Sequence, residues 1–177
     1  MLESGKNPNP TKDQHFMVDK NMLARICETA GIQKGETVIE IGGGEGALTD
    51  YLLESECFLT VVEKDPYYAN FLKEKYHEID RITIIEGDAL EIDFSSYDRI
   101  IANLPYTITE PFLMNLAYTG ALNYNPNDPK GSILKKITLV VSQNSLRKMV
   151  APVQITEGDS RHLNQEFGFI SAICKTF

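Results

Sequence analysis

The chain of 177 residues carries 42% hydrophobic and 24% charged side chains and a net charge of −8. This composition suits one soluble globular domain with a sizeable core. No apolar run approaches the roughly 20 residues of a membrane-spanning helix, and the N-terminus lacks the apolar core of a signal peptide. The three cysteines and three histidines are too scattered for a disulfide framework or a metal site, so we predict a cytoplasmic protein without metal.

In chain order, residues 1–12 are predicted to form a flexible arm and residues 13–177 a single domain. Five apolar runs are typical of strands covered on both faces: Thr37–Gly42, Phe58–Glu63, Ile82–Glu86, Arg99–Leu104 and Ile137–Ser142. The predicted helices are Asn21–Ala30, Ala47–Ser55, Pro66–His77 with Asp65 as N-cap, Pro111–Tyr118 and Ser145–Val150. The alternation predicts an α/β fold with a mostly parallel, doubly wound sheet. The final segment, Phe167–Phe177, is expected to add an antiparallel edge strand.

Three glycines, Gly42, Gly44 and Gly46, follow the first predicted strand and open a helix. Glycine lets the backbone turn sharply there and lets a ligand approach the positive end of the helix. Glu63 ends the second strand, where a carboxylate can accept both hydroxyls of a ribose. This pattern predicts a nucleoside cofactor, and it also satisfies the fingerprint of NAD-binding proteins.

Two further acids narrow the choice of cofactor. Glu40 stands inside an otherwise apolar strand, where burial is costly unless the carboxyl is paired. A carboxyl near the ligand would help to fix a cationic amino-acid moiety, and it would repel a pyrophosphate. Asp88, followed by Ala89, closes the third strand and can accept a hydrogen bond from an adenine amino group, although a turn or cap role explains it equally well.

The end of the fourth strand carries the segment Asn103-Leu104-Pro105-Tyr106. The Asn103 side-chain oxygen and the Leu104 carbonyl can accept the two hydrogens of a planar amine. Pro105 stiffens the backbone, and Tyr106 offers a ring on which the flat group bearing the amine can stack. Two acceptors at the amine favour a tetrahedral nitrogen whose lone pair can attack a methyl group. These four residues are therefore the predicted catalytic residues.

Taken together, these segments resemble the ribosomal RNA adenine dimethyltransferase family. The likeness lies in Ile39–Thr49, Val62–Asp65, Gly87–Leu90 and Asn103–Tyr106, and in Gln14-His15-Phe16, which is similar to the family's N-terminal cofactor-lid motif. The resemblance implies a Rossmann-like class I methyltransferase fold, S-adenosylmethionine as cofactor and the exocyclic amine of adenine in RNA as acceptor. It also implies that Gln14, Phe16, Ala89 and Asn103 join the acids and glycines above in binding the cofactor.

The chain differs from that family in ways that leave the acceptor open. We expect the chain to lack the family's helical C-terminal RNA-binding domain, with a partner subunit as one replacement for it. The net charge of −8 is also unusual for an RNA binder. The acid-free stretch 129–156 holds the predicted phosphate contacts Lys130, Lys135, Lys136, Arg147 and Lys148. The alternatives are methylation of another planar nitrogen, in a protein glutamine or a small molecule, and a cofactor-binding module without catalysis.

Overall fold

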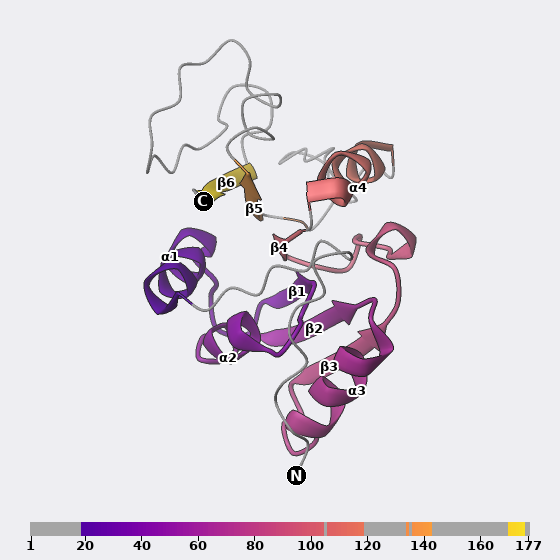
Figure 1. Cartoon of the computed structure of the whole chain (residues 1–177). Helices are drawn as coiled ribbons and strands as arrows, with labels where there is room; N and C mark the ends of the chain where they lie inside the picture. The colour runs from indigo at the N-terminus through magenta and orange to yellow at the C-terminus, as the bar shows by residue number, and fades with distance from the viewer. Residues whose placement is uncertain (1–18, 105, 119–133, 135, 143–169, 176–177) are drawn as a thin grey trace.

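The computed structural model describes residues 19–104, 106–118, 134, 136–142 and 170–175. Within them, six strands form one sheet in the order β3-β2-β1-β4-β5-β6 (Figure 1). The strands are β1 (Thr37–Ile41), β2 (Phe58–Glu63), β3 (Ile82–Glu86), β4 (Arg99–Asn103), β5 (Lys136–Ser142) and β6 (Ile170–Lys175). The helices are α1 (Lys20–Ala30), α2 (Ala47–Leu53), α3 (Pro66–Lys75), the 3₁₀ helix η2 (Ala89–Glu91) and α4 (Tyr106–Tyr118). The predicted α/β fold with a doubly wound sheet is confirmed.

Each face of the sheet is covered by its own hydrophobic cluster, because successive strand residues point to opposite faces. One cluster joins α1, α2 and α3 to the sheet through Leu23, Ile26, Val38, Leu52, Val61, Leu72 and Ile101. The other joins α4 and η2 to the sheet through Ile39, Ala89, Ile100, Phe112, Leu116 and Ile137. Figure 1 shows α1 and α2 on one side of the sheet and α4 on the other. Burial on both faces explains the near-continuous apolar strands.

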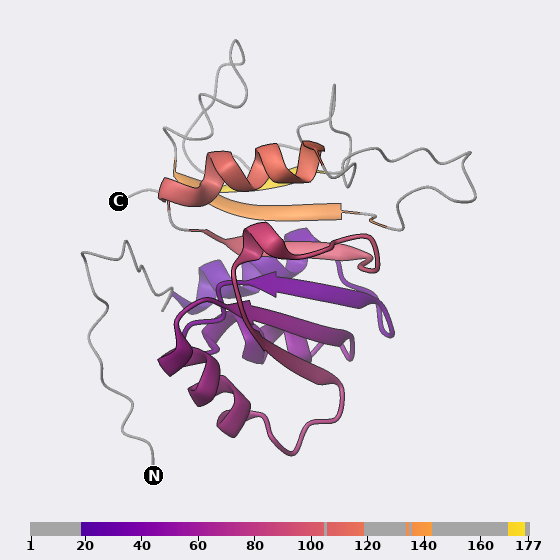
Figure 2. The same cartoon turned by 90° about the vertical axis from the view of Figure 1, so that its right-hand side faces the viewer.

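All strand pairs in the described residues are parallel, so their carboxyl ends share one edge of the sheet (Figure 2). The chain runs outward from β1 to β3 and then returns to place β4 on the other side of β1. The strand order therefore reverses between β1 and β4. In open α/β sheets this reversal leaves a crevice at the carboxyl edge, where ligands bind.

The predicted antiparallel edge strand is wrong in its direction. β6 pairs with β5 in parallel, with Ile137 opposite Ile170 and Ser142 opposite Lys175. A parallel return needs a connection of a dozen or more residues, and residues 143–169 between the two strands supply that length. The apolar pattern predicted a strand here, but it carries no information about direction.

The predicted start of the fourth helix is also wrong, since α4 begins at Tyr106 and holds Pro111 inside it. Proline is typical of a first helical position, which is why the sequence suggested a start at Pro111. The extra turn is favoured by packing, because Ile108, Phe112 and Leu116 at helical spacing lie against the sheet. The predicted helix Ser145–Val150 lies outside the described residues.

A buried ion pair fixes the amino edge of the sheet, opposite the carboxyl ends. Arg99 in β4 donates from Nε and Nη2 to the Glu36 carboxylate, and from Nη1 to the carbonyl oxygen of Ala30 at 2.6 Å. The two charged side chains are only 12% and 8% exposed. Arg99 therefore ties β4 both to the start of β1 and to the end of α1, whose last carbonyls need partners.

Glu36→Gln is expected to lower the free energy of unfolding by about 2 kcal/mol, because it removes the charge from hydrogen bonds in a largely buried pair. Chemical denaturation measures this change. The matched control is Glu56→Gln, which removes a carboxylate from the pair with Lys34, whose side chains are 76% and 60% exposed. The control is expected to leave stability nearly unchanged. Equal effects of the two substitutions would contradict a structural role for the buried pair.

Within the described parts of the chain, no helix combines the length and the apolar character needed to cross a membrane. The same residues contain no group of three or more histidine, cysteine or acidic side chains that could hold a metal ion.

Candidate functional site

The carboxyl edge of the sheet brings together residues that lie far apart in the sequence. In the register of the sheet, Ile41 lies opposite both Val62 and Ala102. The next residues along these strands, Gly42, Glu63 and Asn103, therefore end three neighbouring strands side by side. On the outer side, Glu63 lies opposite Glu86 in β3, and the β3 end leads directly to Gly87 and Asp88. The predicted site residues on β1, β2, β3 and β4 thus gather at the point where the strand order reverses.

The glycine loop between β1 and α2 needs glycine for its backbone geometry. Gly42, Gly44 and Gly46 have φ angles of 84°, 53° and 82°, in the left-handed region that favours glycine. A hydrogen bond of 2.8 Å from the Gly46 amide to the carbonyl oxygen of Gly43 closes the turn. The loop passes close to the predicted catalytic segment, because a Cβ built on Gly42 would lie 3.7 Å from the carbonyl oxygen of Asn103.

Gly43 is a functional candidate that the sequence analysis missed. It is buried, and a Cβ at this position would lie 2.5 Å from Cγ1 of Val61 and 2.7 Å from Cδ1 of Leu72. No side chain fits at such distances unless its neighbours move. The loop therefore packs directly onto β2 and α3. The only sequence signal was the unbroken run Gly42-Gly43-Gly44, and the crowding at Gly43 depends on neighbours distant in the sequence.

The Glu63 carboxylate is held by two backbone amides, one in the glycine loop and one just after β2. Its Oε2 accepts a hydrogen bond of 2.9 Å from the Gly44 amide, and its Oε1 accepts one of 2.8 Å from the Asp65 amide. The side chain is 8% exposed. Each carboxylate oxygen can accept a second hydrogen bond, so the two amides orient the carboxylate and leave it able to accept the hydroxyls of a ribose.

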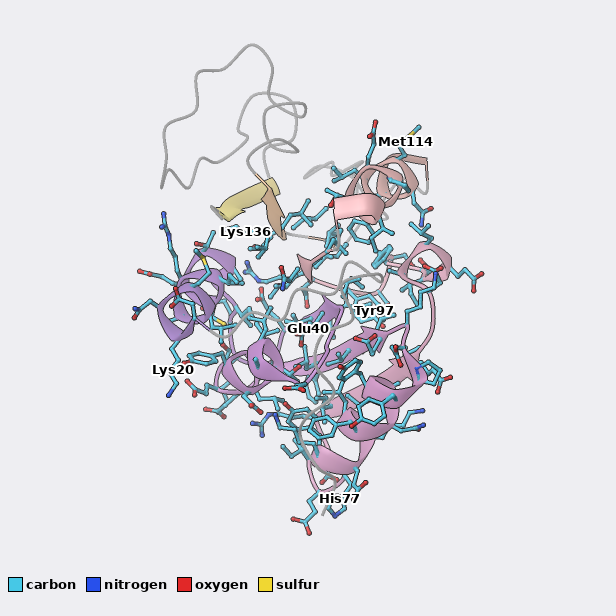
Figure 3. All side chains as sticks on the ribbon, viewed as in Figure 1. Lys20, Glu40, His77, Tyr97, Met114 and Lys136 are labelled. Atoms are coloured by element: carbon cyan, nitrogen blue, oxygen red, sulfur yellow. The ribbon has the colours of Figure 1, made fainter. Side chains whose placement is uncertain are left out.

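Glu40 is the most unusual group at the site. It is 1% exposed, and its Oε2 accepts a hydrogen bond of 2.7 Å from the Thr49 hydroxyl in α2. Its Oε1 is buried and has no hydrogen-bond partner within the described part of the chain, although such groups normally have one. Figure 3 shows the Glu40 side chain in the interior of the molecule. Burial, reinforced by the negative charge of Glu63, raises the Glu40 pKa to about 8.

The raised pKa of Glu40 predicts a specific pH dependence of stability. An ordinary glutamate titrates near 4.5 in the unfolded chain, and Glu40 titrates near 8 in the folded protein. The folded state therefore binds the proton more tightly, and the Glu40 contribution to the free energy of unfolding falls as pH rises from about 4.5 to about 8. Glu40→Gln is expected to remove this pH-dependent loss of stability. Denaturation of the wild type and of Glu40→Gln at pH 6 and at pH 8 would measure the difference. Parallel pH profiles would contradict the assignment.

Asp88 sits at the carboxyl end of β3 as the N-cap of η2. Its Oδ1 accepts from the Leu90 amide at 3.1 Å, and its Oδ2 forms an ion pair of 2.6 Å with Nζ of Lys64. Lys64 is the main cause of the lowered Asp88 pKa. The capping role that the sequence allowed is thus observed, and the carboxylate lies at the carboxyl edge of the sheet with the other predicted site residues. Ala89 beside it is 5% exposed and packs into the core.

The predicted catalytic segment lies where β4 passes into α4. Asn103 is half-buried at the strand end, and the Leu104 side chain, 4% exposed, is anchored in the core beneath α4. This anchor fixes the backbone that carries the Leu104 carbonyl. Tyr106 is the first residue of α4, but its side chain and Pro105 lie outside the described residues, as do the predicted cofactor residues Gln14 and Phe16.

Among the predicted phosphate contacts, only Lys136 is described. It begins β5 at the amino edge of the sheet, and its Nζ donates to the carbonyl oxygen of Thr29 at the end of α1; Figure 3 labels it beside β5. Lys136 therefore makes a structural contact at the edge opposite the site, and its prediction as a phosphate contact is not supported. Lys130, Lys135, Arg147 and Lys148 lie outside the described residues.

Sequence comparison places these features in a family. The chain matches the family described as ribosomal RNA adenine dimethylase over residues 5–162. It is 46% identical over 108 residues to the probable ribosomal RNA small subunit methyltransferase A of Haloarcula marismortui, covering 58% of this chain and 38% of that one. It is 44% identical over 108 residues to the ribosomal RNA small subunit methyltransferase A of Coxiella burnetii, covering 58% and 42%. The matches thus span about two fifths of each relative's length.

Solved structures share the fold. A dimethyladenosine transferase from Plasmodium falciparum superposes with a TM-score of 0.65 at 26% identity, covering 78% of this chain and 47% of that one. The 23S rRNA methyltransferase ErmE superposes with a TM-score of 0.61 at 27% identity, covering 76% and 50%. The fold is therefore the Rossmann-like fold of methyltransferases, as the resemblance implied.

Proposed function

Because the chain belongs to the ribosomal RNA adenine dimethylase family, we propose that it is an S-adenosylmethionine-dependent N-methyltransferase acting on the exocyclic amine of adenine in RNA. The observation that carries this proposal is the meeting of the glycine loop, Glu63 and Asn103 at one edge of the sheet. Two relatives are named ribosomal RNA small subunit methyltransferase A, and two structural neighbours are a dimethyladenosine transferase and a 23S rRNA methyltransferase. These names support the same acceptor class here.

The described residues fit the cofactor on two independent observations. The buried Oε1 of Glu40 has no partner among the residues that the structure describes, and a cationic amino group beside it, reached directly or through water, would supply one. Gly42 and Gly44, both with left-handed φ angles, leave the loop backbone free of side chains where a ligand would approach. In this proposal Glu63 binds the ribose, and Asp88 and Ala89 contact the adenine. Gln14, Phe16 and Asn103 complete the cofactor-binding set.

When bound, S-adenosylmethionine supplies an electrophilic methyl group on a positively charged sulfur. The protein's task is then to orient the acceptor amine. The Asn103 side-chain oxygen and the Leu104 carbonyl accept its two hydrogens, which localises the nitrogen lone pair for attack. Tyr106 stacks on the base, and Pro105 holds the backbone between these groups. No strong base is needed, so the rate depends on positioning and electrostatic stabilisation.

An adenine inside structured RNA must be unpaired or flipped out to reach these acceptors. We keep Lys130, Lys135, Arg147 and Lys148 as proposed phosphate contacts. Acceptor binding that weakens steeply as salt is raised would support RNA, and binding that resists salt would favour a protein glutamine or a small molecule. The domain limits 1–12 and 13–177, the partner subunit and the cytoplasmic location stay predictions.

Calorimetric titration of the purified chain with S-adenosylmethionine, and with NAD as control, tests the cofactor assignment. Saturable binding of S-adenosylmethionine alone is expected, since its cationic amino group would give the buried Glu40 Oε1 a partner and NAD carries no such amino group. Radiolabelled methyl transfer to immature ribosomal subunits, free RNA and protein extracts then identifies the acceptor. Binding of NAD alone, or of neither compound, would overturn the proposal.

A further inference from the structure

The C-terminal end of α3 contacts the back of the glycine loop through two adjacent side chains, Lys75 and Tyr76. The Tyr76 hydroxyl shares its single hydrogen between the carbonyl oxygen of Gly46 at 3.1 Å and Oδ1 of Asp50 at 2.7 Å. Lys75 Nζ donates to the carbonyl oxygen of Glu45 at 3.2 Å and to Oδ2 of Asp50 at 2.8 Å. Two successive loop carbonyls and an acid in the first turn of α2 are therefore held from α3. We call Lys75 and Tyr76 the α3 clamp.

The clamp and the loop fit each other sterically. Tyr76 is 5% exposed, and a Cβ built on Gly46 would lie 2.4 Å from its hydroxyl oxygen and 3.0 Å from Nζ of Lys75. The Lys75 ammonium also lies 4.9 Å from the centre of the Tyr76 ring, which favours a cation–π contact. The absence of a side chain at Gly46 thus lets the two donors reach the loop.

The Tyr76 hydroxyl stays a hydrogen-bond donor across the neutral pH range. Burial and the Asp50 carboxylate raise the pKa of Tyr76 far above its ordinary value, so its hydroxyl keeps its hydrogen. A peptide unit is planar, with its carbonyl and its N–H pointing in opposite directions. The Gly46 carbonyl accepts the Asp50 amide of α2 at 3.0 Å, and the Tyr76 hydroxyl adds a second donor from α3. Holding this carbonyl also holds the Ala47 amide, at the start of α2, on the opposite side.

We propose that Lys75 and Tyr76 are positioning residues for cofactor binding, which hold the carbonyls of the glycine loop toward α3 and thereby orient the loop amides and the start of α2 at the carboxyl edge. The inference rests on the proposed function, because it assigns a role at the same site. It predicts that removing a clamp donor weakens cofactor binding without slowing the chemical step. A purely structural contact between α2 and α3 would instead change stability alone.

Tyr76→Phe tests the proposal, since it removes the hydroxyl and keeps the buried ring. Titration with S-adenosylhomocysteine is expected to give a Kd about five- to tenfold above wild type, from the loss of one hydrogen bond to the loop. In the methyl-transfer assay, the KM for S-adenosylmethionine is expected to rise by a similar factor, with kcat within about twofold. Tyr97→Phe is the matched control. Tyr97 is half-buried and lies beside Asp98, whose amide donates to the Thr37 carbonyl oxygen at the amino edge.

A second variant tests the same proposal if Tyr76→Phe folds poorly. Lys75→Met removes the ammonium and keeps most of the stem, and it is expected to raise the Kd about two- to fivefold. In the double variant, the losses of cofactor affinity are expected to be non-additive, because both donors contact the same loop and the same Asp50 carboxylate. If the wild type binds the ligand and both single variants bind it with the same Kd, the clamp is overturned and the proposed function stands. Failure of wild type to bind at all would overturn the function itself.

Discussion

Asn103→Ala is expected to lower the rate of methyl transfer at saturating cofactor by about 10²–10³-fold. The side-chain oxygen of Asn103 is one of two acceptors assigned to the hydrogens of the substrate amine. Alanine removes that acceptor and leaves the end of β4 otherwise unchanged. Because the loss concerns an interaction made in the transition state, single-turnover measurement at saturating cofactor should report it directly.

Two further variants separate the proposed role from a general disturbance of the strand end. Asn103→Asp keeps acceptor oxygens at this position, so its rate is expected to fall between those of wild type and alanine. Asn70→Ala makes the same change at an exposed position of α3 and is expected to leave the rate unchanged. Cofactor affinity measured on Asn103→Ala should fall by no more than about tenfold. An alanine variant that turns over within threefold of wild type would rule out the assignment.

The strands were predictable because burial on both faces requires nearly continuous runs of apolar residues, which are visible in the sequence. β2 and β3 coincide with the predicted ranges Phe58–Glu63 and Ile82–Glu86, and Asp65 caps α3 as expected. Parallel strands that share a carboxyl edge also made the grouping of the site residues predictable. The direction of β6 and the start of α4 were not predictable, because a strand pattern has no direction and a helix can continue through a proline when its apolar face is well packed.

The supports of the site were hidden for a different reason. Glu40 could be recognised as an acid in an apolar strand, but its hydrogen bond to Thr49 depends on how α2 packs against β1. Tyr76 and Gly46 stand 30 residues apart in the chain, and nothing local in the sequence indicates their contact. The predicted ligand-binding residues thus form motifs that can be recognised in the sequence. The residues that support these motifs can be identified only from the three-dimensional structure.

Gly43→Ala is expected to weaken binding of S-adenosylmethionine by about 100-fold, because a shift of the loop by a fraction of an ångström misplaces groups that must meet the ligand together. The added methyl group would lie 2.5 Å from Val61 and 2.7 Å from Leu72. Both side chains are almost fully buried, at 0% exposure, so neither can move away freely. The loop backbone must then shift, and we also expect a loss of about 1–3 kcal/mol in the free energy of unfolding, as for other overpacked cores.

The matched control for this substitution is Gly87→Ala at the end of β3. A Cβ there would meet Cγ2 of Ile85 at 3.6 Å, which is an ordinary contact, so binding and stability should both stay close to wild type. Val61→Ala combined with Gly43→Ala relieves one of the two clashes and is expected to restore part of the lost affinity. Calorimetric titration of the four proteins, together with denaturation curves, measures both quantities. If Gly43→Ala bound the cofactor as tightly as Gly87→Ala, the loop would tolerate displacement, and the close packing of Gly43 against β2 and α3 would have no part in binding.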